Sequence, residues 1–142
     1  MGILGAVRLS KYTDTSTSVE RQHEVIRWWS DGHDGELVHT TEDIDVSGSV
    51  SPFERDGLGP WLTDPEKVRQ WEVLVAWKLD RISRNARDTL ELLTWAEANG
   101  KRIVCVDDSI DTESEMGRFF LQLAAIFAEL ERKTIAARIL KG

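Results

Sequence analysis

The pattern of apolar and polar positions divides the 142-residue chain into short apolar runs and amphipathic segments that alternate. Continuous apolar runs bounded by turn residues are typical of buried strands, and apolar positions at helical spacing indicate helices. We expect strands over residues 3–9, 36–40, 73–77 and 102–106, and helices over 18–30 and 86–99. Such alternation predicts an α/β domain with a mainly parallel central sheet flanked by helices in three layers.

Smaller signals add detail to this outline. Thr17 and Glu20 match a capping box at the start of the first helix, and Trp61 with Leu62 indicates a short helical segment. On the second helix, Ala86, Leu90 and Leu93 are expected to share the buried face.

The last predicted helix, from about Glu115 to Lys141, differs from the others. It carries an apolar seam, and at full length it would extend roughly 40 Å, about the width of a domain. The seam consists of Phe120, Leu123, Phe127 and Leu130. We therefore expect a core over 1–114 and, over 115–142, the start of a long projecting helix that continues beyond Gly142 in the natural chain.

Composition narrows the class of protein. The 41% apolar and 30% charged residues are typical of a globular domain, no apolar run approaches a membrane span, and Cys105 is the only cysteine. We expect a cytoplasmic protein with a buried thiol. The net charge of −7 argues against a nucleic-acid partner, but bases gather locally over residues 78–87 and 132–141. Local fields bind anions even when the total charge is negative.

The stretch DIDVSGSVSPFE at 43–54 matches the calcium-loop pattern of an EF-hand. An EF-hand needs a helix on each side of this loop. The preceding residues are strand-like, and Gly57, Gly59 and Pro60 follow it. The three histidines also lack the spacing of metal ligands. We therefore expect no metal site and another purpose for this loop.

Ser10 and three arginines form the constellation that carries chemistry. Arg8 lies two residues before Ser10, on the same face of the first strand. Arg81 and Arg84 follow the third predicted strand and lie on one side of a turn. Guanidinium groups bind phosphate oxygens and stabilise charge on phosphorus, so a hydroxyl among arginines suits a phosphodiester. The chain contains no GxSxG motif and no P-loop, which disfavours acyl transfer and nucleotide hydrolysis.

Four blocks of the sequence resemble one family. They read RLSKYTDTSTSVERQ, EDIDVSGSVSPFERDGL, WKLDRISRN and IDTESEMGRFFLQLAAIFAELER, and they span Arg8 to Arg132 in order. They are similar to the catalytic domain of the serine site-specific recombinases, which include resolvases, invertases and large phage integrases. The long first loop and the SGSVSPFER wording look most like the large serine integrases of actinobacterial phages.

The resemblance implies a role for each matching position. Ser10 matches the nucleophile that attacks DNA and becomes a 5′-phosphoserine. The other matches are Arg8, Arg81 and Arg84 around the scissile phosphate, Asp80 as the acid beside them, Gln22 packed into the site, Ser47 and Arg55 on a mobile loop near the phosphate, and Glu131 and Arg132 where subunits meet each other and DNA.

The resemblance also implies partners. The family needs no cofactor, acts on double-stranded DNA attachment sites, and forms dimers that join into a tetramer through the long helix. A directionality factor is a further expected partner, and no membrane is. Ala6 departs from the family pattern, which often has tyrosine there.

Three alternatives stay open. A small resolvase or invertase would share the chemistry. A flavodoxin- or receiver-like signalling domain would share the fold class, although it would have acidic residues where Arg8 and Ser10 stand. A non-catalytic interaction domain would have no use for the arginines.

Overall fold

The computed structural model describes residues 1–9, 18–47, 49–119, 121–123, 126–127 and 130. In chain order its elements are β1 (Gly2–Leu9), α1 (Val19–Asp31), β2 (Glu36–Ile44), η1 (Pro52–Glu54), α2 (Gly59–Thr63), α3 (Pro65–Val68), β3 (Val73–Ala76), η2 (Leu79–Arg81), α4 (Ala86–Ala98), β4 (Arg102–Cys105) and β5 (Ile110–Asp111). Residues 115–119, 121–123, 126–127 and 130 are also helical. This order confirms the predicted α/β class.

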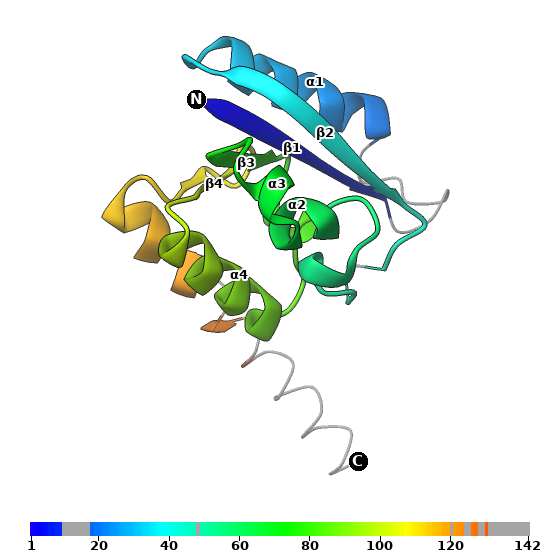
Figure 1. The fold of residues 1–142 in the computed structure, drawn as a ribbon. Helices are drawn as coiled ribbons and strands as arrows, with labels where there is room; N and C mark the ends of the chain where they lie inside the picture. Colours follow the sequence, from blue (N-terminus) through cyan, green and yellow to red (C-terminus); the bar gives the residue numbers. More distant parts are fainter. Residues whose placement is uncertain (10–17, 48, 120, 124–125, 128–129, 131–142) are drawn as a thin grey trace.

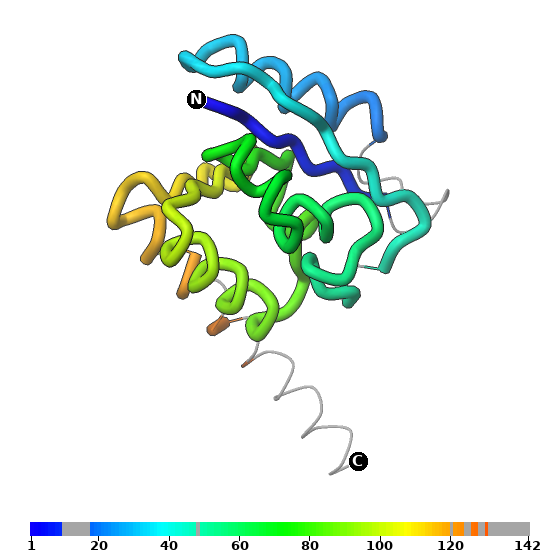
Figure 2. The backbone as a smooth tube through the Cα atoms, viewed as in Figure 1, coloured from blue at the N-terminus to red at the C-terminus, as the bar shows by residue number. Residues whose placement is uncertain are grey.

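The central sheet has five strands in the order β2-β1-β3-β4-β5. The pairs β1–β2, β1–β3 and β3–β4 are parallel, and only β4–β5 is antiparallel. Figure 2 shows β1 running between β2 and β3. Because β1 and β3 are parallel neighbours, the segments that follow their carboxyl ends meet at one edge of the sheet.

Helices cover both faces of the sheet, so the predicted three-layer arrangement is confirmed (Figure 1). On one face, Ile26 and Trp29 of α1 pack against apolar side chains of β1, β3 and β4. On the other face, α2, α4 and Leu121 of the C-terminal helix build a larger apolar cluster. Cys105 is fully buried in this cluster, and burial raises the pKa of its thiol.

Three local predictions were wrong. Helix α1 is capped by Ser18, whose side chain accepts a hydrogen bond from the Arg21 amide, and not by Thr17. Strand β2 continues to Ile44, so Asp43 belongs to a strand and not to the loop after it. On α4, Leu92 is buried and Leu90 is partly exposed, which turns the helix slightly from the expected face.

The C-terminal helix packs on the domain through Leu121. Leu121 is almost completely buried, whereas Phe119 is 55% exposed. Further along, Leu123 is half-buried, but Phe127 is 62% and Leu130 54% exposed. An apolar face of this helix therefore leaves the core as it proceeds, whereas Phe120, Glu131 and Arg132 lie outside the described residues.

Candidate active site

Arg8 lies near the carboxyl end of β1, and its guanidinium reaches the turn that follows β3. Its Nε and Nη2 donate to the carbonyl oxygen of Asp80 at 3.1 and 2.8 Å, and its Nη1 donates to that of Val46 at 2.9 Å. The residue is only 1% exposed. One side chain thus joins the end of β1, the turn η2 and the loop after β2.

Arg81 closes the same cluster from the other side. Its Nη1 donates to the carbonyl oxygen of Arg8 at 3.1 Å, and its Nε lies 3.1 Å from Oδ1 of Asp80 in an ion pair. Arg81 is 1% exposed, whereas Arg84, one turn further on, is exposed. The structure therefore brings together Arg8, Asp80 and Arg81, with Arg84 at the surface.

The electrostatics of this cluster favour an anion. Burial, together with the positive charges of Arg81, Arg84 and Arg55, lowers the pKa of the Arg8 guanidinium to about 10, against the opposing charge of Asp80. Like charges this close repel one another, and a bound anion relieves that repulsion. A phosphate group is the ligand that several guanidinium groups bind best.

Gln22 holds Arg8 from α1. Its side-chain oxygen accepts from the Arg8 amide at 3.2 Å, and its nitrogen donates to the Arg8 carbonyl oxygen at 3.1 Å. Gln22 is completely buried. The pairing of β1 with β3 ends at Ala6, so the glutamine amide takes up backbone groups that β3 no longer reaches. The side chain therefore fixes the position of Arg8 without pointing to solvent.

Arg55 is buried and contacts the backbone of the turn η2 and the residue after it. Its Nε donates to Asp43 at 2.9 Å, and its Nη1 donates to the carbonyl oxygens of Arg81 and Ile82 at 2.8 and 3.0 Å. Burial lowers its pKa, and Asp43 opposes this. Ser47, by contrast, is exposed, and its hydroxyl contacts that of Ser49. Of the two residues expected on a loop near the phosphate, Arg55 is therefore buried and Ser47 lies at the surface.

Asp43 is the functional-site neighbour that sequence reasoning missed. The residue is 3% exposed, and its carboxylate accepts from the Gly57 amide at 2.7 Å and the Leu58 amide at 3.2 Å, in addition to Arg55. These contacts place Asp43 in the fold and occupy its oxygens. Asp43 is the first position of the calcium-like pattern, but its carboxylate binds Arg55 and two backbone amides. The strand β2 stands where an EF-hand would have its entering helix.

Ser10, the expected nucleophile, directly follows Leu9 and lies outside the described residues. Among the described residues, no group of three or more His, Cys, Asp or Glu side chains is arranged to hold a metal ion. None of the helices in the described part of the chain is both long and apolar enough to cross a membrane.

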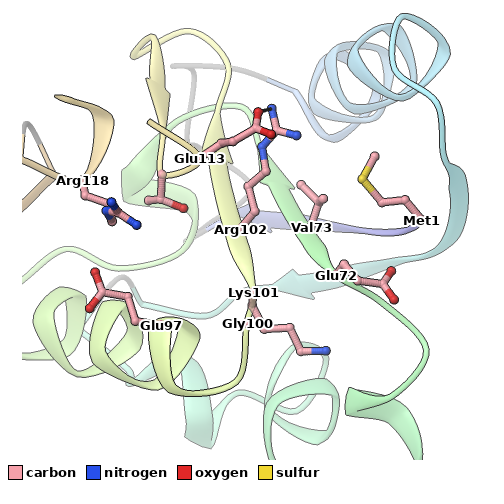
Figure 3. Close-up of a pocket in the computed structure, with 10 residues that line it drawn as sticks. Met1, Glu72, Val73, Glu97, Gly100, Lys101, Arg102, Glu113 and Arg118 are labelled. Atoms are coloured by element: carbon pink, nitrogen blue, oxygen red, sulfur yellow. Dashed lines mark ion pairs between the residues drawn. The ribbon is translucent and has the colours of Figure 1, made fainter. Parts of the chain in front are cut away.

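A charged pocket lies at the opposite edge of the sheet (Figure 3). It is lined by the residues that begin β3 and β4, whereas Arg8 and Asp80 lie at the strand ends. Arg102 points to Glu113 in Figure 3 and pairs with it at 3.0 Å and with Asp111 at 2.6 Å. Lys101 donates to backbone carbonyl oxygens. Arg102 is paired with two carboxylates, and Glu72 and Glu97 also line this pocket, so its charge is mixed and unlike that of the arginine cluster.

Comparisons with known proteins agree with this geometry. The family described as "Resolvase, N terminal domain" matches residues 3–142. The DNA-invertase hin of Salmonella typhimurium is 40% identical over 97 residues, which are 68% of this chain and 48% of that protein. The serine recombinase gin of Escherichia phage Mu is 31% identical over 140 residues, which are 99% of this chain and 65% of that protein.

Solved structures show the same fold. The N-terminal catalytic domain of TP901-1 integrase superposes with a TM-score of 0.77 at 27% identity, covering 94% of this chain and 98% of that domain. A resolvase-family site-specific recombinase from Streptococcus pneumoniae superposes with a TM-score of 0.71 at 22% identity and shows the shared fold.

The fold and the family match together define a serine recombinase catalytic domain. The chain belongs to the resolvase N-terminal domain family. This membership removes the receiver-like alternative. The chain spans about half the length of the DNA-invertase relatives it matches, such as the 48% of hin.

Proposed function

We propose that this chain is the catalytic domain of a site-specific DNA recombinase that cleaves and rejoins DNA through Ser10. The observation that carries the proposal is the contact between Arg8 and Arg81. Arg8 lies near the carboxyl end of β1, two residues before Ser10, and Arg81 lies in the turn after β3. A phosphodiester bound there would lie beside the hydroxyl.

The reaction is a transesterification. The Oγ of Ser10 attacks the scissile phosphorus, the bond to the 3′ oxygen breaks, and a 5′-phosphoserine and a 3′ hydroxyl result. The serine loses a proton and the leaving oxygen gains one, with Asp80 as the carboxylate nearest the arginines for positioning or proton transfer. The ester conserves the energy of the broken bond, so rejoining is the reverse reaction.

The arginines supply charge stabilisation. Negative charge that develops on the phosphoryl oxygens is stabilised by preorganised guanidinium groups in a partly water-excluded site. Arg8 and Arg81 are held by backbone carbonyls, Gln22 fixes Arg8, and Arg84 is exposed at the surface. Arg84 is therefore the arginine that meets the DNA backbone first, and Ser47 and Arg55 support the site from the loop after β2.

Members of this family act on DNA sites and form oligomers in general. We propose that the natural protein acts on double-stranded attachment sites in the bacterial cytoplasm, at the nucleoid, and that its subunits join through the C-terminal helix. Phe127 and Leu130 are exposed on this helix, which is consistent with an interface. The residues proposed for it are Phe120, Leu123, Phe127, Leu130, Glu131 and Arg132.

Integrase and invertase outcomes share this chemistry. The resemblance of the long first loop and of SGSVSPFER at 47–55 to large serine integrases favours integration, with a directionality factor as a regulating partner. The relatives hin and gin are a DNA invertase and a serine recombinase. Recombination of paired attachment sites by the product of the complete gene would separate the two outcomes.

The test is the covalent intermediate. The 142-residue chain is fused to a zinc-finger array and mixed with duplexes that carry two inverted zinc-finger sites around a randomised spacer. We expect a protein–DNA adduct on a denaturing gel and, after digestion, a phosphorylated peptide containing Ser10. Ser10→Ala should bind the DNA and form no adduct. Ser30→Ala, which removes a hydroxyl bonded to the Ile26 carbonyl in α1, should form it normally. An adduct from Ser10→Ala would overturn the assignment.

A further inference from the structure

Two aspartates that follow β4 contact the catalytic turn that follows β3. Oδ2 of Asp108 accepts a hydrogen bond from the Leu79 amide at 2.7 Å, and Oδ2 of Asp107 accepts one from the indole Nε1 of Trp77 at 2.6 Å. Strands β3 and β4 are parallel neighbours, and the Asp107 amide donates to the Trp77 carbonyl oxygen at 2.9 Å. The two segments therefore leave the sheet side by side.

Asp108 supplies the N-terminal capping hydrogen bond of η2. This 3-10 turn spans Leu79–Arg81, and its own N-cap residue, Lys78, makes no side-chain capping hydrogen bond. The first amides of a helical turn have no partner within it, so a side-chain oxygen usually supplies one. Here the oxygen comes from a residue 29 positions later in the chain. The orientation of η2 therefore depends on the loop after β4.

Trp77 provides the second support. The residue is 8% exposed, and the guanidinium carbon of Arg81 lies 5.2 Å from the centroid of its ring. Nζ of Lys78 lies 4.7 Å from the same ring. A cation within about 6 Å of an indole is attracted to it. Because Asp107 fixes the indole, Arg81 packs on a ring that is itself held in place.

The contacts form one chain from the β4 loop to the arginine cluster. Asp108 sets the start of η2, Trp77 supports Arg81 at its end, and Arg81 donates to the carbonyl oxygen of Arg8. Asp80, within the same turn, accepts two hydrogen bonds from the Arg8 side chain. A shift of η2 would therefore move Asp80 and Arg81 together and change what Arg8 contacts.

We propose that Asp108 and Trp77, with Asp107 behind it, are positioning residues for DNA cleavage, and this rests on the proposed function. They hold Asp80 and Arg81 in the geometry that the phosphoryl group needs. Their effect on the reaction would pass through Asp80 and Arg81. A misplacement of about 1 Å in such a site lowers a rate on the order of a hundredfold.

A purely structural role predicts a different result. If these contacts only stabilised the fold, their loss would reduce the fraction of folded protein. A smaller folded fraction lowers the amplitude of adduct formation and leaves the rate constant of the folded molecules unchanged. The rate constant at saturating DNA therefore distinguishes positioning from stability.

The experiment measures adduct formation by Asp108→Ala in the zinc-finger fusion described above, with randomised-spacer duplex as substrate. We expect a rate constant at saturating DNA that is lower by roughly tenfold to a hundredfold, with unchanged affinity for the duplex. Asp108→Asn keeps a side-chain oxygen for the Leu79 amide and should restore most of the rate. Trp77→Phe keeps an aromatic ring against Arg81 but loses the hydrogen bond to Asp107. Its rate constant should therefore lie between those of Asp108→Ala and Asp108→Asn.

Asp111→Ala is the matched control. It removes another carboxylate near β4, one that pairs with Arg102 at the other end of the strand. We expect it to lower stability and leave the rate constant unchanged. A wild-type rate constant in Asp108→Ala, with only lower amplitude or melting temperature, would overturn the positioning role. An absence of adduct from the unmodified protein would instead refute the proposed function itself.

Discussion

Removing the carboxylate of Asp43 should unfold much of the chain at temperatures where the natural protein is stable. In Asp43→Ala the buried guanidinium of Arg55 loses its ion-pair partner, and the amides of Gly57 and Leu58 lose their acceptor. Breaking a buried ion pair by removing one partner costs about 3–5 kcal/mol, and each unsatisfied buried amide costs about 1–3 kcal/mol. These costs overlap, because water entering the cavity would solvate all three groups.

We therefore expect a loss of about 3–5 kcal/mol, a large part of the roughly 5–15 kcal/mol that stabilises a typical domain. For a chain of this size the melting temperature should fall on the order of 10–20 °C. The side chain of Asp43 is 2% exposed, so little of this cost is relieved by solvent already present.

Urea denaturation followed by tryptophan fluorescence measures the change. Asp56→Ala is the control, since this carboxylate lies in the same segment but is exposed. We expect its unfolding midpoint to stay close to that of the natural chain. If Asp43→Ala lost less than about 1 kcal/mol with an unchanged urea dependence, the assignment of Asp43 as the partner of a buried cation would be wrong.

Two further predictions concern other parts of the chain. Burial raises the pKa of the Asp111 carboxyl, but hydrogen bonds from Arg102 and the Glu113 amide and the Arg102 charge lower it more, so the folded pKa lies below its usual value. Its contribution to stability is therefore present above the unfolded pKa of about 3.9 and lost as the pH falls through the folded pKa. Asp111→Asn should make urea midpoints fall less between neutral pH and about pH 3, and an identical fall would refute this. Replacing Phe127 and Leu130 by serine should weaken self-association of the 142-residue chain in sedimentation experiments without lowering its melting temperature, because both side chains are more than half exposed; unchanged association would exclude this face as the interface.

The strands that the sequence predicted well are those buried on both faces. Residues 3–9 and 73–77 read as continuous apolar runs because helices cover them on each side, as the structure shows for β1 and β3. The edge strand β2 was predicted too short, since its second half, TTEDI, has four polar residues before Ile44 and so contains no apolar run. The two-residue β5 carries too few residues to form a pattern.

The arginines of the site were predictable as residues but not as a buried network. Arg8 and Arg81 stood out because cations are unusual beside apolar strands. Their contacts join positions 73 residues apart, and such pairs leave no local signal. The same holds for Asp43, whose partner Arg55 lies across a loop, and for Asp108. Periodicity describes which face of an element is buried, whereas these contacts depend on how separate elements meet.

The hydrogen bonds of Gln22 have a consequence for sequence variation. Its amide group replaces a peptide unit of a neighbouring strand, because it both donates to and accepts from the backbone of Arg8. Asparagine has the same group on a side chain one carbon shorter, and ionised glutamate has no donor. In a library randomised at position 22 and selected for recombination, glutamine should therefore return almost alone. Enrichment of glutamine alone at position 22 would indicate that the backbone of Arg8 in β1 needs both a donor and an acceptor from this side chain.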